Sequence, residues 1–537
     1  MSGAPRVTVV GGGIAGLSAA LRLAERGYPV KVYERNEWLG GDLGSRAVAG
    51  THLDVYPHMY LNWYHNLWSL IADATGEAPR SGFIPCSTVW QLRQGDYPRF
   101  RGIRDAYSPW KPRRVLGNIA SGVVPPADML VYGYSSIDLL GARLPGTIAL
   151  EELSVSAFLR SRPYMTEAAA DAYDSFITMV WSLPSYLTSV ADYQTYLGHC
   201  VAAPTPPFWL SRGSAQERVI GPVREALARA GAEIITGVRA LGVACPAGRA
   251  HRLTLRHTRY DEGLGAFTDE GEEWQEDVDE LILAVNAPEL SGLVRSGPPG
   301  ERIIEFMPQA SQLSRLQELP IPIMHVYFNR RLPGIPAEPV GLFRSSLALA
   351  FTDISQTWPG MGENTVLALS CSDPHGLPRT GWEADAMTML GQLADYLRFP
   401  APAGWGTPGP IDWARTRYDS NANAQLFVNQ IGTDSWRPEV RCEELANVCF
   451  AGDFCHNRVG MTTIESAVTA GVEAAEAIVQ RHGIGSPVQV HEPRELPDAL
   501  YDLLRVAWAP YAVGGKTWSA GTDAVRTVSR RLGAVLR

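Results

Sequence analysis

Lysine and positive charge are scarce in this sequence of 537 residues. Only three of the 47 basic residues are lysines, namely Lys31, Lys111 and Lys516, and the net charge is −9. A nucleic-acid-binding protein would carry an excess of positive charge on one face, so we exclude that class of partner.

Cysteine and long apolar runs are also missing. The seven cysteines form no CxxC pair and no metal-ligand spacing, so we predict neither a disulfide framework nor a metal site. No uncharged apolar stretch approaches the length of about 18 residues that a membrane-spanning helix needs. The apolar run 7–10 breaks at once into three glycines, which is not typical of a signal peptide. We therefore expect a cytoplasmic protein, either freely soluble or peripheral at a membrane.

The first 34 residues carry the most specific motif. Residues 7–10 predict a buried strand, residues 14–24 a helix and residues 30–34 a second strand, with a GxGxxG sequence between the first two elements. In such a βαβ unit, Gly11 permits the tight turn, Gly13 leaves room for a diphosphate, and Gly16 lets the helix pack closely on the strand. Glu34 ends the second strand, where a carboxylate can accept hydrogen bonds from a ribose. This unit predicts a dinucleotide site but leaves NAD and FAD open.

A second glycine pair follows closely after this unit. Gly40 and Gly41 precede Asp42, and Ser45 comes shortly after. With the βαβ unit, this pattern resembles the flavin amine oxidase and carotenoid desaturase superfamily, in which the glycine pair runs along the FAD diphosphate. Many members carry arginine where this chain has Asp42. The resemblance implies an FAD site, to which we also assign Ile14, Ala15 and Arg35.

The far end of the chain resembles the second flavin motif of that superfamily. Residues 448–453 predict a strand that ends in Gly452 and Asp453, and a small-residue helix begins near Thr463 and Ile464. The resemblance implies that the Asp453 carboxylate contacts the ribityl or phosphate region and that the helix N-terminus faces the flavin. It also places the backbone of Val238 against adenine.

The middle of the chain resembles the plant-type phytoene and ζ-carotene desaturases and their squalene-associated relatives. The segment 52–58, which ends in His58, carries this resemblance. Tyr56 stands where these desaturases usually have glycine, next to the flavin. We therefore assign His58 and Tyr56 to the catalytic side. Amine oxidases often keep a lysine on a strand that our alignment places at Ile323; no lysine occurs between Lys111 and Lys516, which argues against amine oxidation.

Two further segments leave alternatives open. The stretch from Tyr56 to Trp68 is rich in aromatic residues. Its spacing predicts a helical face that is either core or the lining of an apolar tunnel and that consists of Tyr60, Tyr64, Leu67, Trp68 and Ile71. The tail beyond 490 ends in a basic amphipathic helix, which either caps the protein or contacts an anionic membrane.

Together these patterns predict an α/β flavoprotein with a discontinuous, Rossmann-type FAD-binding domain and an inserted α+β substrate domain. We assign residues 1–75, 210–290 and 440–483 to the first, residues 76–209 and 291–439 to the second, and residues 484–537 to a C-terminal helical extension.

The expected reaction is dehydrogenation of a small hydrophobic molecule, of isoprenoid or polyene type, by hydride transfer to flavin N5. Oxidation of an amine or amino-acid derivative, and redox-neutral isomerisation, are the alternatives. The oligomeric state stays open.

Overall fold

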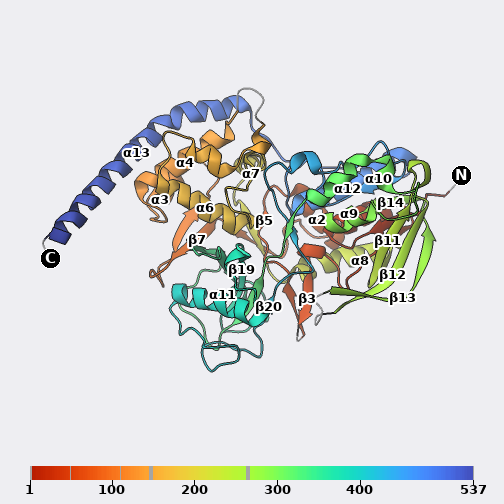
Figure 1. Cartoon of the computed structure of the whole chain (residues 1–537), viewed down its shortest axis with the longest axis horizontal. Coiled ribbons are helices and arrows are strands. Elements are labelled where there is room, and N and C mark those ends of the chain that lie inside the picture. The colour runs from red at the N-terminus through yellow and green to blue at the C-terminus, as the bar shows by residue number, and fades with distance from the viewer. Residues whose placement is uncertain (1–2, 49, 109–110, 144–148, 262–265, 536–537) are drawn as a thin grey trace.

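The computed structural model describes residues 3–48, 50–108, 111–143, 149–261 and 266–535. Two halves lie side by side, one built on a parallel sheet and the other on a mixed sheet with a group of helices (Figure 1). This arrangement confirms the predicted α/β class.

The parallel sheet has five strands that come from distant parts of the chain. In spatial order they are β10 (Glu233–Ile235), β2 (Val30–Tyr33), β1 (Val7–Val10), β14 (Glu280–Leu283) and β22 (Val448–Phe450). Their residues are mostly apolar, as expected for strands that are covered on both faces. All five strands fall within the three stretches assigned to cofactor binding from the sequence.

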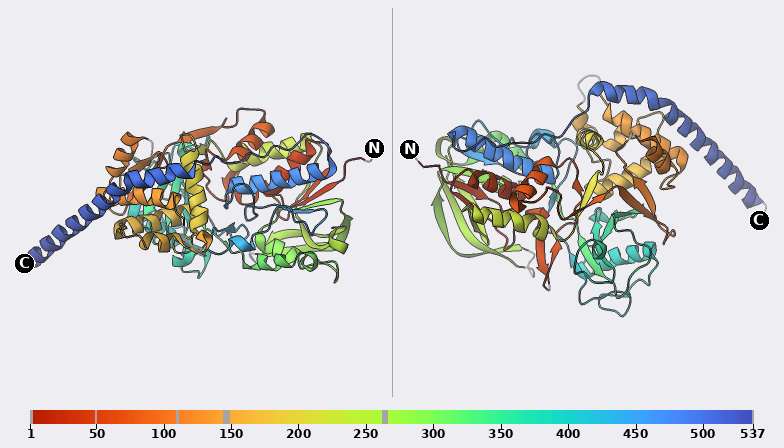
Figure 2. Two further views of the ribbon diagram at one scale, coloured as in Figure 1. Left: turned by 90° about the horizontal axis from the view of Figure 1, so that it is seen from above. Right: turned by 180° about the vertical axis from the view of Figure 1, so that it is seen from behind.

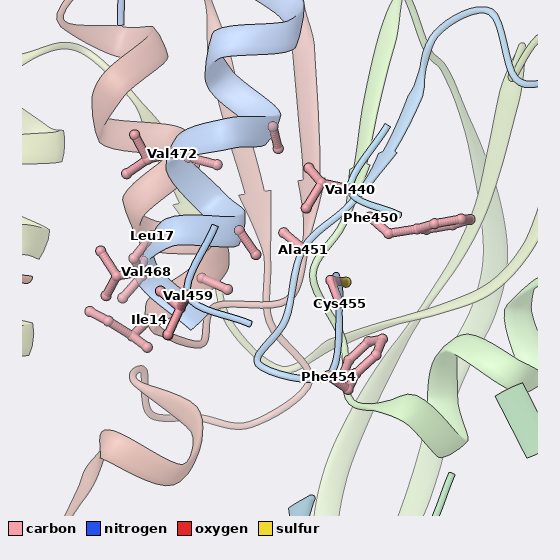
Figure 3. Close-up of a cluster of buried hydrophobic side chains, with 14 of the residues drawn as sticks. Ile14, Leu17, Val440, Phe450, Ala451, Phe454, Cys455, Val459, Val468 and Val472 are labelled. Carbon is pink, nitrogen blue, oxygen red and sulfur yellow. The ribbon is translucent and has the colours of Figure 1, made fainter. Parts of the chain in front are cut away.

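Helices cover one face of this sheet. They are α1 (Ile14–Ala24), α2 (His65–Thr75), α8 (Gly221–Arg229) and α12 (Ile464–His482). Figure 3 shows Ile14 and Leu17 of α1 beside Val468 and Val472 of α12, so the two flavin-motif helices share one core. An antiparallel sheet lies on the opposite side (Figure 2, left) and consists of β11 (Val238–Ala244), β12 (Arg252–Asp261) and β13 (Ala266–Asp277). Near it are α9 (Ala287–Leu293) and α10 (Ile303–Phe306).

The second half is organised around a seven-stranded sheet. In spatial order its strands are β20 (Arg417–Asp419), β16 (Ile323–Tyr327), β19 (Val366–Cys371), β18 (Leu349–Asp353), β17 (Val340–Phe343), β7 (Thr88–Arg93) and β8 (Arg101–Arg104). Its helices are α3 (Pro112–Ile119), α4 (Pro126–Leu140), α5 (Val155–Arg160), α6 (Glu167–Trp181), α7 (Val190–Ala202) and α11 (Trp382–Leu397).

Short strands connect the two halves. They are β3 (Ser45–Val48) with β4 (Thr51–Asp54), β5 (Tyr60–Leu61) with β9 (Phe208–Ser211) and β6 (Phe83–Cys86), and β15 (Glu318–Leu319) with β21 (Leu426–Phe427). Tyr60 was predicted on a helical face with Trp68, but it pairs with Trp209 in a strand, and the helix begins only at His65. The strand pairing outweighs the helical spacing of the side chains.

A long helix, α13 (Asp498–Val535), follows the last stretch assigned to cofactor binding and runs over α4 (Figure 1). It is longer than the amphipathic segment seen in the sequence. None of the helices in the described parts of the chain combines the length and apolar character needed to cross a bilayer.

Candidate functional site

A cavity of about 480 Å³ lies where the carboxyl ends of β1, β2, β14 and β22 face the N-termini of α1 and α12. Most of the site residues predicted from the sequence line it. They are Gly11, Gly13, Ile14, Ala15, Glu34, Arg35, Gly40, Gly41, Asp42, His58, Val238, Gly452, Asp453, Thr463 and Ile464. The carboxyl end of a parallel sheet is where α/β folds bind dinucleotides.

The glycine loop has the geometry that a diphosphate requires. Gly11 has a φ of 112°, and a Cβ there would stand 2.1 Å from the Ala284 carbonyl oxygen. A Cβ at Gly16 would stand 2.0 Å from the Gly11 carbonyl oxygen, so Gly16 packs helix on strand and lies outside the cavity lining. A Cβ at Gly13 would meet nothing nearer than Gly41 at 3.9 Å. The loop is therefore tightly packed at Gly11 and Gly16, whereas Gly13 leaves free space on the cavity side. A phosphate group can approach the backbone there.

The second glycine pair lies directly beside this loop. The Gly40 N–H donates to the Gly12 carbonyl oxygen at 2.8 Å, and Gly40 and Gly13 form a parallel bridge. Both glycine segments therefore border the same part of the cavity.

The Glu34 carboxylate is held in place by the backbone around it. One oxygen accepts from the Gly12 N–H at 2.6 Å, and the other accepts from the backbone and side-chain N–H groups of Asn36, both at 2.8 Å. Arg35, which follows it, forms an ion pair with Glu289 at 2.7 Å and lies over the Phe267 ring. The fixed carboxylate suits the ribose hydroxyls of a dinucleotide.

Beside α1, helix α12 begins with a side-chain cap. The Thr463 hydroxyl oxygen accepts from the Ser466 N–H at 3.1 Å, as an N-cap residue does. The next residue but one, Glu465, is fully buried and accepts from the backbone N–H groups of Asn66 at 2.7 Å and Leu67 at 2.9 Å. Glu465 thus connects α2 to α12. The burial of Glu465 raises the pKa of its carboxyl to about 8. This burial was not predicted from the sequence.

Three carboxyl groups near the dinucleotide end, those of Asp42, Asp453 and Glu318, interact electrostatically. Burial, together with the smaller effect of the negative charge of Asp453, raises the pKa of Asp42 to about 8. Burial also raises the pKa of Asp453 to about 6, although the Arg437 guanidinium opposes that shift. Burial, followed by the charges of Asp42 and Asp453, raises the pKa of Glu318 to about 9. Glu318 was missed in the sequence because it lies in no motif. Asp42 and Glu318 therefore hold protons near neutral pH.

His58 lines the cavity, and burial lowers its pKa to about 4, so the imidazole is neutral near pH 7. Its Nδ1 atom is buried and has no hydrogen-bond partner among the described residues. The His58 ring therefore places a neutral polar group in the cavity wall.

Tyr56 and Ser45 lie behind the cavity wall and not in it. The Tyr56 hydroxyl donates to the Ala424 carbonyl oxygen, and its ring packs against Ile321 and Ile323 in a small apolar cluster. Ser45 donates to Asp54 at 2.7 Å and accepts from the Gln216 N–H at 2.9 Å. Neither Tyr56 nor Ser45 is among the described residues that line the cavity. Both side chains instead hold together the segments behind the cavity wall.

The other end of the cavity is formed by the second half of the molecule. Its walls come from β7, β17, β18 and β19, from the C-terminal end of α6 and from the middle of α7. None of these segments belongs to a motif recognised in the sequence. The lining there is mainly apolar and includes Met179, Val180, Trp181, Tyr196, Phe208, Val340, Phe351 and Ala368. Gln91, Thr352, Ser370 and Asn429 provide its polar side chains.

The site can be compared with known proteins. The family model described as NAD(P)-binding Rossmann-like domain matches residues 9–74, and the model described as flavin containing amine oxidoreductase matches residues 206–479. The chain is 36% identical over 519 residues to a ζ-carotene desaturase of Synechocystis sp., covering 88% of this chain and 97% of the relative. It is 24% identical over 500 residues to a 15-cis-phytoene desaturase of Synechococcus elongatus, covering 89% and 96%.

Solved structures share the fold at low sequence identity. An oxidoreductase from Methanosarcina mazei has a TM-score of 0.61 at 15% identity, with 88% of this chain and 100% of that chain covered. Cyclohexylamine oxidase from Brevibacterium oxydans has a TM-score of 0.58 at 14% identity, with 89% and 100% covered. With the predicted flavin motifs gathered around one cavity, these matches show that FAD is the cofactor and that the chain belongs to the flavin-containing amine oxidoreductase family, in the superfamily that includes the carotenoid desaturases.

Proposed function

We propose that this oxidoreductase dehydrogenates a neutral hydrophobic substrate of isoprenoid or polyene type. One observation carries the proposal. Among the described residues, every charged side chain of the cavity lies at the dinucleotide end, and the part formed by the second half contributes none. A site for an ammonium substrate would need a carboxylate or another partner for the positive charge. The ζ-carotene and phytoene desaturase relatives support the same substrate class.

The residues at the junction have separate proposed roles. Bound FAD supplies a hydride acceptor at its N5 atom. Glu34 and the glycine loop bind the dinucleotide. His58, neutral and with an unpaired Nδ1, accepts the proton that leaves the carbon next to the one that gives up hydride, or it orients that carbon. Tyr56 holds the segment at Ala424 against the apolar cluster and thereby positions the wall next to His58.

We also propose that the outer face of α13 contacts an anionic membrane. Five large apolar side chains on this helix are 55–76% exposed, namely Leu503, Val506, Tyr511, Val513 and Trp518. The sequence of the last twelve residues adds four arginines and no acidic residue. Apolar and aromatic side chains next to a basic segment are typical of helices that bind anionic lipid surfaces.

The substrate class is tested by anaerobic reduction of the FAD-loaded protein. Squalene and a linear polyene, each delivered in detergent, are compared with cyclohexylamine and putrescine, and the loss of the oxidised flavin absorbance is recorded. Reduction by the hydrocarbons and not by the amines is expected. Reduction by the amines alone would replace the proposal with amine oxidation.

A further inference from the structure

A second, smaller cavity of about 220 Å³ adjoins the apolar end of the site. It lies among α3, α4, α6 and α7, and α13 contributes to its wall. The same eight side chains border both cavities: Met59, Val89, Gln91, Met179, Val180, Trp181, Tyr196 and Phe208. The two cavities therefore adjoin across these side chains, most of which are apolar or aromatic.

The lining of this second cavity suits an uncharged chain. Most of it is aliphatic or aromatic, and the hydroxyl groups of Tyr107 and Tyr196 are paired with each other at 2.9 Å. Among the described residues that line this cavity, Asp105 alone carries a charged side chain. Its carboxylate already pairs with Lys111 at 3.2 Å and Arg114 at 3.4 Å. A polar ligand would lose its hydrogen bonds to water and find few replacements here.

Helix α13 contributes Trp508 to this wall and is fixed on α4 at several points. Arg505 binds Asp138 at 2.9 Å, and the Ser519 hydroxyl donates to Asp128 at 2.8 Å. Between them, Gly515 approaches the α4 backbone so closely that a Cβ would stand 2.7 Å from the Ala127 carbonyl oxygen. These contacts on both sides of Trp508 hold its ring at the cavity. The helix lies outside the stretch matched by the amine oxidoreductase model, which ends at residue 479.

We infer that the second cavity receives the distal end of an extended apolar substrate and that Trp508 of α13 limits the length of chain that fits. The inference rests on the proposed function, because it assigns a further part of the binding site to the same substrate. Helix α13, which lies outside the residues matched by the family model, would then contribute to substrate specificity.

Gly133 of α4 offers a direct test. It lies on the same helical face as Met129, Ser136 and Leu140, which all line the second cavity, and a Cβ at this position would meet no atom within 4 Å. Gly133→Leu should therefore fill the cavity without disturbing the backbone. Gly117→Leu on α3 is the matched control, because a Cβ at Gly117 also meets nothing within 4 Å, and Gly117 does not line the cavity.

The experiment measures binding of farnesol, geranylgeraniol and squalene to the full-length, FAD-loaded protein by quenching of tryptophan fluorescence, with flavin reduction as a second readout. Gly133→Leu should weaken binding of the longest probe at least about tenfold relative to farnesol, since an apolar pocket discriminates on the order of tenfold or more for each misfitting group. Gly117→Leu should leave that ratio unchanged. Trp508→Ala should shift the preference toward the longest probe, whereas Trp518→Ala, exposed on the same helix, should not.

These measurements distinguish failure of the length limit at Trp508 from failure of the proposed hydrophobic dehydrogenation. Equal length preference in the wild type, Gly133→Leu and Trp508→Ala would overturn the inference while leaving hydrophobic dehydrogenation in place. If no isoprenoid binds the wild type and an amine reduces its flavin, both are wrong. Retained FAD absorbance and an unchanged far-ultraviolet circular dichroism spectrum establish that each variant is folded.

Discussion

Gly471 of α12 lies against Ala15 of α1 so closely that an added Cβ would stand 2.1 Å from the Ala15 carbonyl oxygen. The two residues are 456 positions apart, and each belongs to one of the two flavin motifs. The contact brings the N-termini of both helices to one cavity.

Gly471→Ala should therefore lower the free energy of unfolding by about 1–3 kcal/mol, as overpacking in a close-packed interior does. The matched control is Gly391→Ala in α11, where a Cβ meets nothing within 4 Å and alanine should be neutral or slightly stabilising. Urea unfolding of both variants measures the difference. Equal stability of the two variants would show that the helices can separate at no cost.

Glu34→Ala should weaken FAD binding roughly 10- to 100-fold, because a hydrogen bond to a charged acceptor contributes about 1.5–3 kcal/mol. Glu37→Ala, an exposed carboxylate three residues away, is the control. FAD retained after extensive dialysis is the readout. Full retention by Glu34→Ala would contradict the assignment of this carboxylate to the ribose.

The raised pKa of Asp42 predicts that FAD binding weakens at alkaline pH. Its raised pKa of about 8 means that it is protonated at lower pH and becomes a carboxylate as the pH rises through that value, beside the negative diphosphate. The groups that act on it are Asp453, Glu318 and Arg35. We expect the FAD dissociation constant to rise on the order of tenfold between about pH 7 and about pH 9.

Asp42→Asn removes this titration and should flatten most of that rise, leaving the smaller contribution of Glu318. Quenching of flavin fluorescence on binding gives the dissociation constants. An identical pH profile in the wild type and the variant would exclude Asp42 as its source.

His58→Ala should slow flavin reduction by substrate about 10²- to 10⁴-fold and leave FAD bound. In the wild type, the rate should depend on neutral His58 and fall only as the pH drops through about 4, not near the ordinary histidine value of about 6.5. Stopped-flow absorbance measures both effects, with the exposed His251→Ala as control. A wild-type rate in His58→Ala would place the chemistry elsewhere.

If the outer face of α13 contacts an anionic membrane, the protein should sediment with vesicles of phosphatidylglycerol at low salt. The double variant Val506→Glu/Val513→Glu should lose it, because both side chains are exposed and charge there opposes insertion. Tyr186→Glu, an equally exposed position outside the helix, should retain it. A wild type that never sediments but elutes as a dimer would assign the face to a second copy of the chain.

The cofactor end of the site could be predicted from the sequence because its geometry is local. Glycine positions such as Gly11 and Gly13 are set by backbone turns that leave a pattern within a few residues. The substrate end could not, since Gln91, Val340 and Phe351 meet only through the pairing of β7, β17 and β18, and none belongs to a motif.

Two residues show what the sequence does not reveal. Tyr56 was assigned to the catalytic side from the desaturase resemblance; in the structure its hydroxyl donates to the buried Ala424 carbonyl oxygen, and Tyr56 is not among the described residues that line the cavity. Glu318 has no local pattern, because its importance comes from the burial and charge of Asp42 and Asp453 beside it.

The proposed reaction is two-electron dehydrogenation of a hydrophobic substrate at this FAD site. It can be tested by a single anaerobic turnover of the FAD-loaded protein with the hydrocarbon that bleaches the flavin, followed by mass spectrometry of the extracted product. One product, lighter by one hydride and one proton, is expected for each flavin reduced. A product of unchanged mass, or full flavin occupancy with no reduction by any hydrocarbon, would contradict it.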